Sequence, residues 1–123
     1  MIEVVAGIIY KDNKFLIAQR NFKKHQGGLW EFPGGKVEKN ETYEEALIRE
    51  IKEELNADIK VDECVGEKIH HYPEKDVKLK FFKATLLSDK IETLEHEDYR
   101  WIIKNEEDKF EFAEADKAVF EWI

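Results

Sequence analysis

Apolar residues along this chain follow strand spacing in most places and helix spacing in two. A mostly apolar, β-branched run from Ile2 to Tyr10 predicts a buried strand at the start. The turn sequence Lys11-Asp12-Asn13 follows, and the next apolar run predicts a second strand from Lys14 to Arg20. Three further strands are expected at Ile59 to Tyr72, at Val77 to Leu87 and, as a short one, at Trp101 to Ile103.

The first helical stretch is marked by its start, its apolar face and its end. Thr42 with Glu45 three residues later is a capping box, so we expect a helix to begin near Thr42. It is expected to run to about Leu55, where Asn56 can adopt the left-handed conformation that ends helices. Its apolar side is formed by Leu47, Ile48, Ile51 and Leu55.

A second, short helix is expected from Ala113 to Trp122, with one face formed by Ala115, Ala118, Val119 and Trp122. Strands and helices in this order predict an α/β fold, in which a mixed sheet carries helices on its faces. The chain of 123 residues is long enough for one core, and no linker or repeat divides it. A single domain spanning residues 1–123 is therefore expected.

Charge and cysteine content narrow the partners and the compartment. The net charge is −8 and no run of Lys or Arg exceeds two residues, so we expect no binding to duplex nucleic acid. The N-terminal apolar run lacks a basic leader, so neither a signal peptide nor a membrane span is expected. The one cysteine, Cys64, is interpreted as a small core residue of a cytoplasmic protein. An edge strand would allow a homodimer as well as a monomer.

The segment from Gly34 to Glu54 contains seven glutamates, and three of them point to metal binding. Glu50, Glu53 and Glu54 lie on one side of the predicted helix, three and four residues apart. Carboxylates crowded in this way raise one another's pKa and destabilise the helix, and a bound cation removes both penalties. The alternative is a solvated acidic face.

Oxygen ligands without Cys or His favour Mg²⁺, with Mn²⁺ as a substitute, over zinc. Because Mg²⁺ usually binds carboxylates together with substrate phosphates, a small phosphate-bearing substrate is expected. Gly34-Gly35 follows Pro33 and is expected to form a sharply bending loop that brings backbone carbonyls close to the ligand.

The spacing of these residues resembles the box of the Nudix family. Gly35 is followed after five residues by Glu41, and after seven more by Arg49-Glu50-Ile51-x-Glu53-Glu54. The chain departs from the family at Asn56 and Ala57, where Nudix proteins have glycine and a larger apolar residue. The stretch from Leu29 to Glu38 is similar to the MutT-like branch of nucleoside triphosphate hydrolases.

The resemblance implies an α/β/α sandwich built around a catalytic loop, helix and loop. It also implies a set of residues that hold a divalent metal. These are Glu50, Glu53, Glu54 and a backbone carbonyl of Gly34 or Gly35, with Arg49 orienting the acids and Glu41 supporting them.

For the base that activates water, the resemblance points to the acidic loop before Trp101. Glu95 stands where MutT-like proteins carry a loop glutamate at the metal, and we expect it to act as base or as a further ligand. Glu97 is the fallback, and Glu53 is the competing candidate for the base.

Substrate contacts are expected from four residues outside the helix, namely Arg20, Phe32, Tyr72 and Asp116. Arg20 matches a MutT-like arginine that reaches the phosphates, for which a guanidinium is a suitable donor. Phe32 and Tyr72, together with Trp30, are candidates to line the base pocket. Asp116 matches the amide or acid with which MutT-like proteins contact the nucleobase. When ionised it only accepts hydrogen bonds, which favours cytosine or adenine, whereas a protonated Asp116 could also donate to oxidised guanine.

These residues predict a Mg²⁺-dependent hydrolase that converts nucleoside triphosphates to nucleoside monophosphate and pyrophosphate, with 8-oxo-dGTP and CTP as leading substrates. One alternative is a hydrolase of a linked nucleoside diphosphate such as ADP-ribose. Another is a non-catalytic nucleotide-binding or interaction module. The presence of every acid and the arginine of the box argues against that module, because a scaffold gains nothing from crowded carboxylates.

Overall fold

A seven-stranded mixed sheet forms the centre of the computed structural model, which describes residues 1–123. Its strands are β1 (Ile2–Lys11), β2 (Lys14–Gln19), β3 (Trp30–Glu31), β4 (Gly34–Lys36), β5 (Ile59–His71), β6 (Asp76–Leu86) and β7 (Asp98–Ile102). The helices are α1 (Tyr43–Leu55) and two 3-10 helices, η1 (Lys104–Lys109) and η2 (Glu114–Glu121). Five strands follow the order β3-β2-β1-β6-β5, while β4 pairs with β1 and β7 with β2. Only β1 and β6 run parallel.

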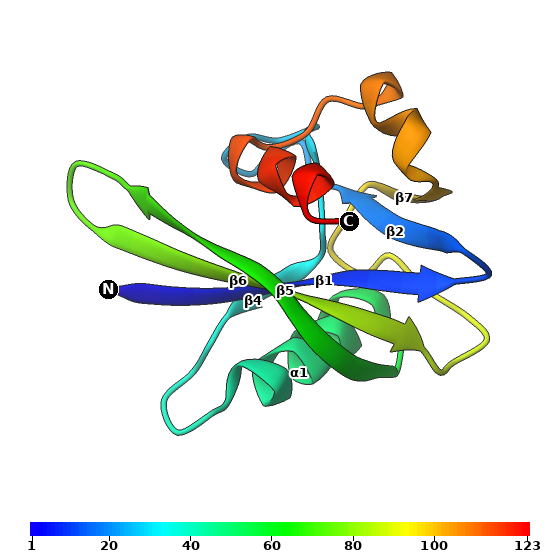
Figure 1. Ribbon diagram of the computed structural model, residues 1–123, viewed down its shortest axis with the longest axis horizontal. Coiled ribbons are helices and arrows are strands. Elements are labelled where there is room, and N and C mark those ends of the chain that lie inside the picture. The colour runs from blue at the N-terminus through cyan, green and yellow to red at the C-terminus, as the bar shows by residue number, and fades with distance from the viewer.

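Helices cover both faces of the sheet, with α1 on one side and η2, drawn in red, on the other (Figure 1). Side chains of β1 alternate between the two cores that result. Val5 and Ile9 pack in the core with α1, whereas Ala6 and Ile8 pack in the core with η2. This arrangement confirms the predicted α/β sandwich, and its second helical layer is made of 3-10 rather than α-helix.

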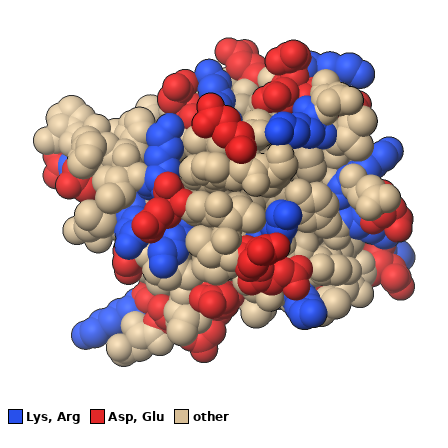
Figure 2. Space-filling model, viewed as in Figure 1, with Lys and Arg blue, Asp and Glu red and all other residues tan.

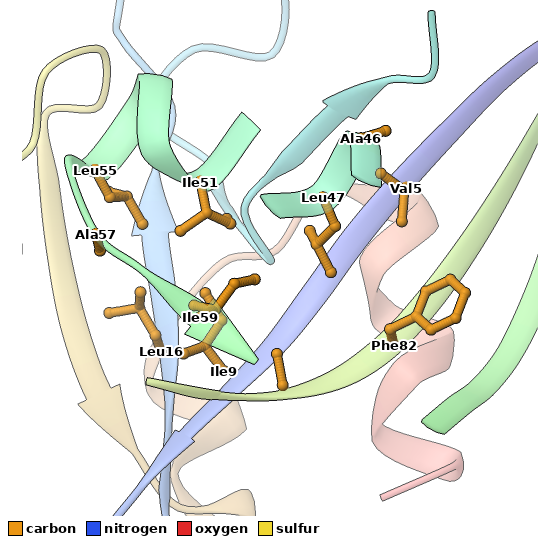
Figure 3. Packing of buried hydrophobic residues seen from close by; sticks show 11 residues of the cluster. Val5, Ile9, Leu16, Ala46, Leu47, Ile51, Leu55, Ala57, Ile59 and Phe82 are labelled. Carbon is orange, nitrogen blue, oxygen red and sulfur yellow. The ribbon is translucent and has the colours of Figure 1, made fainter. Parts of the chain in front are cut away.

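The apolar stripe of α1 fixes how the helix sits on the sheet. Leu47, Ile51 and Leu55 are fully buried and point toward sheet residues such as Ile9 (Figure 3). Burial of each such side chain contributes about 1.5–3 kcal/mol. Ile48, expected on this face, is instead 46% exposed. The expectation was wrong because the buried stripe is rotated toward Ala46 and Glu54.

Both predicted ends of α1 are confirmed. The Thr42 hydroxyl accepts the Glu45 N–H at 3.0 Å, and the Glu45 carboxylate accepts the Thr42 N–H at 2.9 Å. Asn56 ends the helix in the left-handed conformation, with φ 48°, and donates its backbone N–H to the Lys52 carbonyl. Its side-chain amide also donates to Glu92 at 2.9 Å, so Asn56 performs the turn that glycine performs in the Nudix pattern.

Replacing Asn56 tests this turn. We expect Asn56→Ala to lower the free energy of unfolding by about 1 kcal/mol, because alanine is strained at positive φ. Asn56→Gly should stay within about 0.5 kcal/mol of the parent, since glycine relieves the backbone but loses the Glu92 bond. Urea unfolding of both variants measures the difference. Equal stability of the alanine and glycine variants would contradict the assigned turn.

Gly34 and Gly35 do not form the expected bending loop, because they belong to β4. Gly35 pairs with Val5 of β1 in an antiparallel register, and Gly34 pairs with Ala6. A side chain on Gly34 would overlap the backbone of Val5 and Ala6. Close packing of two strands, and not a sharp turn, therefore requires glycine here.

Two further expectations were wrong. Cys64 is exposed and is not a core residue, because register shifts on either side of it interrupt the pairing of β5 with β6. The C-terminal segment is helical as expected, but its repeat is three residues per turn, so Asp116 and Val119 are buried together with Phe120. Ala115, Ala118 and Trp122 are only partly buried. The spacing of apolar residues did not indicate β3 or η1.

Candidate active site

An acidic cavity of about 240 Å³ opens beside the C-terminal half of α1. No hydrophobic residue lines it. Four carboxylates and two basic side chains line this space, which suits a ligand that is itself highly charged. The lining residues are Glu50 and Glu54 of α1, Gly34 and Gly35 of β4, Glu31 of β3, Arg20, Asn21 and Lys24 after β2, and Glu95 and His96 before β7.

Glu54 is the buried acid of this cavity. It is only 7% exposed, and its Oε1 atom forms no hydrogen bond. Burial raises the pKa of Glu54 well above its usual value, and the neighbouring Glu50, Glu31 and Glu95 raise it further. A buried carboxylate in this state needs a proton or a cation, so Glu54 is the acid of the cavity that would gain most from a bound cation.

Glu50 lies directly against the backbone of β4. A side chain on Gly35 would overlap the Glu50 carboxylate, so this glycine makes room for an acid. The close approach also brings the backbone of Gly35 into the acidic cavity beside Glu50 and Glu54. Backbone carbonyls and carboxylates together form an oxygen-only donor set.

Arg49 holds the acids of α1 in place. Its guanidinium donates to both oxygens of Glu41, at 2.7 and 2.9 Å, and to Glu50 at 2.8 Å. It also donates to the Lys36 carbonyl at 2.9 Å, which ties α1 to β4. The hydrogen bonds from Arg49 lower the pKa of Glu41 to about 2. This geometry is the one expected of an orienting arginine and a supporting Glu41.

Glu53 lies apart from the other two acids of the predicted trio. Its side chain is 55% exposed, contacts Arg49 at 3.3 Å and does not line the cavity. No three acidic, His or Cys side chains are grouped as a metal-binding cluster in this structure, and Glu50 accepts a hydrogen bond from Arg49. The roles of Glu53 as ligand and as competing base therefore stay predictions.

The loop before β7 brings one of its two candidate bases into the site. Glu95 lines the acidic cavity, whereas Glu97 accepts the Phe22 N–H at 3.1 Å and lies outside it. Glu95 is thus the candidate that can reach a water in the cavity. Glu97 instead holds the loop between β2 and β3.

The residues of the cavity fit a hard divalent cation. The unpartnered Glu54 oxygen and its raised pKa favour a bound cation, and the all-oxygen donor set favours Mg²⁺ over a softer metal. Glu50, Glu54, Glu95 and a carbonyl of Gly34 or Gly35 are the groups available to hold it.

A second cavity, also of about 240 Å³, adjoins the first and is mostly apolar. The four predicted substrate residues, Arg20, Phe32, Tyr72 and Asp116, all line it. Both cavities share Arg20, Glu31, Gly34 and Gly35. Trp30 does not line either one, because it is buried against Phe110. A mostly apolar cavity thus lies beside a charged one.

Asp116 is the polar group buried in the wall of the apolar cavity. Its Oδ1 accepts the Phe32 N–H at 3.0 Å. Burial raises the pKa of Asp116 from 3.8 to about 8, with Glu31 contributing in the same direction. Asp116 is therefore protonated near neutral pH and can donate one hydrogen bond as well as accept others.

The raised pKa predicts a pH dependence of stability. From about pH 4 to pH 8 the folded protein keeps a proton on Asp116 that the unfolded chain has released. The free energy of unfolding should therefore fall as pH rises, by at most about 1.4 kcal/mol per pH unit from this group. We expect Asp116→Asn to remove this component, so the variant gains stability relative to the parent between pH 5 and about pH 8. Urea unfolding at several pH values measures it. Parallel profiles for parent and variant would contradict the burial of a proton at Asp116, and Glu121→Gln, an exposed acid of η2, is the matched control.

Sequence reasoning did not single out four residues of the acidic cavity: Asn21, Lys24, Glu31 and His96. Glu31 lies in the stretch that resembles MutT-like proteins, and His96 directly follows Glu95. Each is therefore adjacent to a position that the sequence pattern indicated. Glu31 accepts hydrogen bonds from Arg20 and His96, both at 2.9 Å. Burial alone would raise the pKa of Glu31, but these two hydrogen bonds and the charge of Arg20 lower it below its usual value.

The face drawn in Figure 2 shows no large basic patch that would compete for a polyanion. Basic and acidic side chains are interspersed over the face in Figure 2. None of the helices has the length and apolar composition needed to cross a membrane.

Comparison with known proteins gives matches over nearly the whole chain. A family model described as NUDIX domain matches residues 4–122. The chain is 37% identical over 121 residues to the CTP pyrophosphohydrolase of Escherichia coli strain K12, which covers 98% of this chain and 90% of that protein. It is 45% identical over 85 residues to the 8-oxo-dGTP diphosphatase of Proteus vulgaris, covering 68% of this chain and 76% of that protein. Among solved structures, the E. coli ORF135 protein superposes with a TM-score of 0.86 at 36% identity, covering 99% of this chain and 87% of that one.

Proposed function

The chain belongs to the Nudix family, and we propose that it is a MutT-like pyrophosphohydrolase that converts a nucleoside triphosphate to a nucleoside monophosphate and pyrophosphate. The observation that carries the proposal is the pair of adjoining cavities, one charged and one apolar, that share Arg20 and Glu31. A nucleoside triphosphate has the same division, since a polyphosphate is joined to an aromatic base.

The polyphosphate is expected in the acidic cavity. A divalent cation held by Glu50, Glu54 and a carbonyl of Gly34 or Gly35 would neutralise phosphate charge and lower the pKa of a bound water. Arg20, which lines the same cavity, would donate to phosphate oxygens, and Lys24 would add a second positive charge. Glu95 lines the same cavity and is the proposed base for the attacking water, while Arg49 keeps Glu50 and Glu41 fixed.

The base is expected in the apolar cavity, against Phe32 and Tyr72. A protonated Asp116 supports recognition of an oxidised guanine, because it can donate to a ring carbonyl and accept from a ring N–H. An ionised Asp116 would favour cytosine, whose amino group donates. The raised pKa therefore places 8-oxo-dGTP ahead of CTP near neutral pH, and CTP gains above about pH 8.

A panel of nucleotides tests the function. Purified protein with Mg²⁺ is offered canonical and oxidised nucleoside triphosphates and ADP-ribose, and pyrophosphate and nucleoside monophosphate are measured. We expect pyrophosphate from 8-oxo-dGTP and CTP. Activity on ADP-ribose alone would favour hydrolysis of linked diphosphates, and silence across the panel would favour a binding module.

Asp116→Asn tests the choice of base. Asparagine cannot lose a proton, so it keeps one donor and one acceptor at every pH. We expect the ratio of kcat/KM for 8-oxo-dGTP to that for CTP to become independent of pH between about pH 6 and 9, whereas the parent loses preference for 8-oxo-dGTP as pH rises. The same pH dependence in parent and variant would remove Asp116 from base recognition.

A further inference from the structure

His96 is a buried side chain between the two halves of the site. Its side chain is only 6% exposed, and its Nε2 atom lies 2.9 Å from Glu31 Oε2 and 3.9 Å from Glu54 Oε1. Its other nitrogen, Nδ1, is buried without a hydrogen-bond partner. Nε2 is therefore the only ring nitrogen of His96 with a hydrogen-bond partner within reach. The carboxylates of Glu31 and Glu54 compete for it.

Distance decides which carboxylate receives it. A separation of 2.9 Å is a charge-assisted hydrogen bond, and 3.9 Å is too long for one. Glu31 is paired with Arg20 at 2.9 Å and an ionised carboxylate only accepts hydrogen bonds, so the tautomer that fits this contact is the one in which Nε2 donates to Glu31. Glu54 Oε1 consequently stays without a partner beside the imidazole and is available to a cation.

The bond from His96 fixes Glu31, and Glu31 in turn fixes Arg20. The two oxygens of Glu31 are used by different donors: Oε2 by His96, and Oε1 by Arg20 Nη1 at 2.9 Å. Arg20 Nε donates to the His25 carbonyl at 3.0 Å. Neither bond uses Nη2 of Arg20, which leaves this donor for a ligand in the cavities that Arg20 lines.

We propose that His96 and Glu31 are positioning residues that hold Arg20 in the orientation needed to bind the substrate polyphosphate. The proposal rests on the proposed function, since it assigns a role in binding the same substrate. It also separates His96 from metal binding: His96 acts on Arg20 through Glu31, although Glu54 is its neighbour.

Three substitutions test this chain of contacts. His96→Leu removes the donor and keeps an apolar side chain of similar size, and His96→Gln keeps an N–H near the place of Nε2. We expect His96→Leu to raise KM for the preferred nucleoside triphosphate about 10-fold with kcat changed less than about 3-fold, and His96→Gln to restore most of the loss. In an Arg20→Ala background, His96→Leu should change KM less than about 2-fold, because the group it positions is gone.

Two measurements without turnover accompany the kinetics. Calorimetry with inorganic pyrophosphate should show about 10-fold weaker binding to His96→Leu than to the parent. Titration of the free protein with Mn²⁺, followed by the electron paramagnetic resonance signal of the free ion, should give the same midpoint for both. His71→Leu is the matched control, because this exposed histidine contacts Asp76 at the C-terminal end of β5 and lines neither cavity.

Each outcome supports or overturns the proposal. A shifted Mn²⁺ midpoint with unchanged pyrophosphate binding would mean that His96 serves Glu54, and additive effects with Arg20→Ala would mean that it acts independently of Arg20. Failure of His96→Gln to restore binding in a folded protein would also overturn it. If the parent hydrolyses no nucleotide, the proposed function fails, yet the calorimetric comparison still decides whether His96 positions Arg20.

Discussion

Glu54→Gln is expected to lower kcat/KM for the preferred nucleoside triphosphate by about 1,000-fold, equivalent to about 4 kcal/mol of activation free energy. Glutamine keeps the size of the side chain but removes the negative charge, and Glu54 is the buried acid with an unpartnered oxygen in the acidic cavity. Pyrophosphate release at saturating Mg²⁺ measures the effect. Near-parent turnover would remove Glu54 from the metal site.

The same substitution should leave the fold intact, which separates a chemical effect from a structural one. The raised pKa of Glu54 means that the side chain tends to be neutral when no cation is bound, and glutamine is neutral at every pH. The free energy of unfolding in the absence of metal should therefore not fall in the variant. Addition of Mg²⁺ should raise the melting temperature of the parent more than that of Glu54→Gln. Glu44→Gln, an exposed acid in the first turn of α1, is the control for both readouts.

Features set by neighbouring residues could be predicted from the sequence. The capping box at Thr42 and the left-handed turn at Asn56 depend on atoms within one helical turn, and the structure confirms both. The resemblance to the box likewise singled out Glu41 and Arg49, and the structure joins them by a hydrogen bond that spans eight residues. Local geometry and a recognisable pattern were sufficient for this part of the site.

Features that depend on residues far apart in the sequence could not be predicted in this way. Glu53 and Glu54 are adjacent in the sequence, yet Glu54 is buried and Glu53 is half exposed, because the docking of α1 on the sheet decides which one turns inward. The pairing of His96 with Glu31 joins positions 65 residues apart. The two strands that meet at Gly34 are likewise separated by a long segment, so the reason for that glycine could not be seen locally.

Functional residues are therefore easiest to predict from the sequence where a single helix or strand contains all of them. α1 carries Glu50, Glu54 and Arg49 on a single helix, so their spacing in the sequence directly indicates that they lie close together. The substrate side is assembled from β3, the loop after β2 and η2, and each contributes one polar group: Glu31, Arg20 and Asp116. Small changes in these three segments can alter the preferred nucleotide without disturbing Glu50 and Glu54 of α1.

The two glycines of β4 give the second large effect, because adding one methyl group to each should have opposite consequences. In Gly35→Ala the new Cβ would overlap the Glu50 carboxylate, which is the movable end of a side chain. We expect Glu50 to swing aside at small cost to folding, within about 1 kcal/mol, while kcat/KM falls about 100-fold because a ligand is displaced. Activity and urea unfolding are measured on the same preparation.

Gly34→Ala is the matched comparison, since its Cβ would overlap the backbone of Val5 and Ala6, which cannot move without separating β4 from β1. The free energy of unfolding should fall by about 1–3 kcal/mol. Activity per folded molecule should then fall together with stability, whereas Gly35→Ala loses activity in a stable protein. If both alanines destabilise the fold equally and Gly35→Ala stays active, Glu50 does not need the space beside Gly35, and its place among the metal ligands fails. If the predicted contrast is found, the second glycine of the pair serves the metal site and the first serves the sheet.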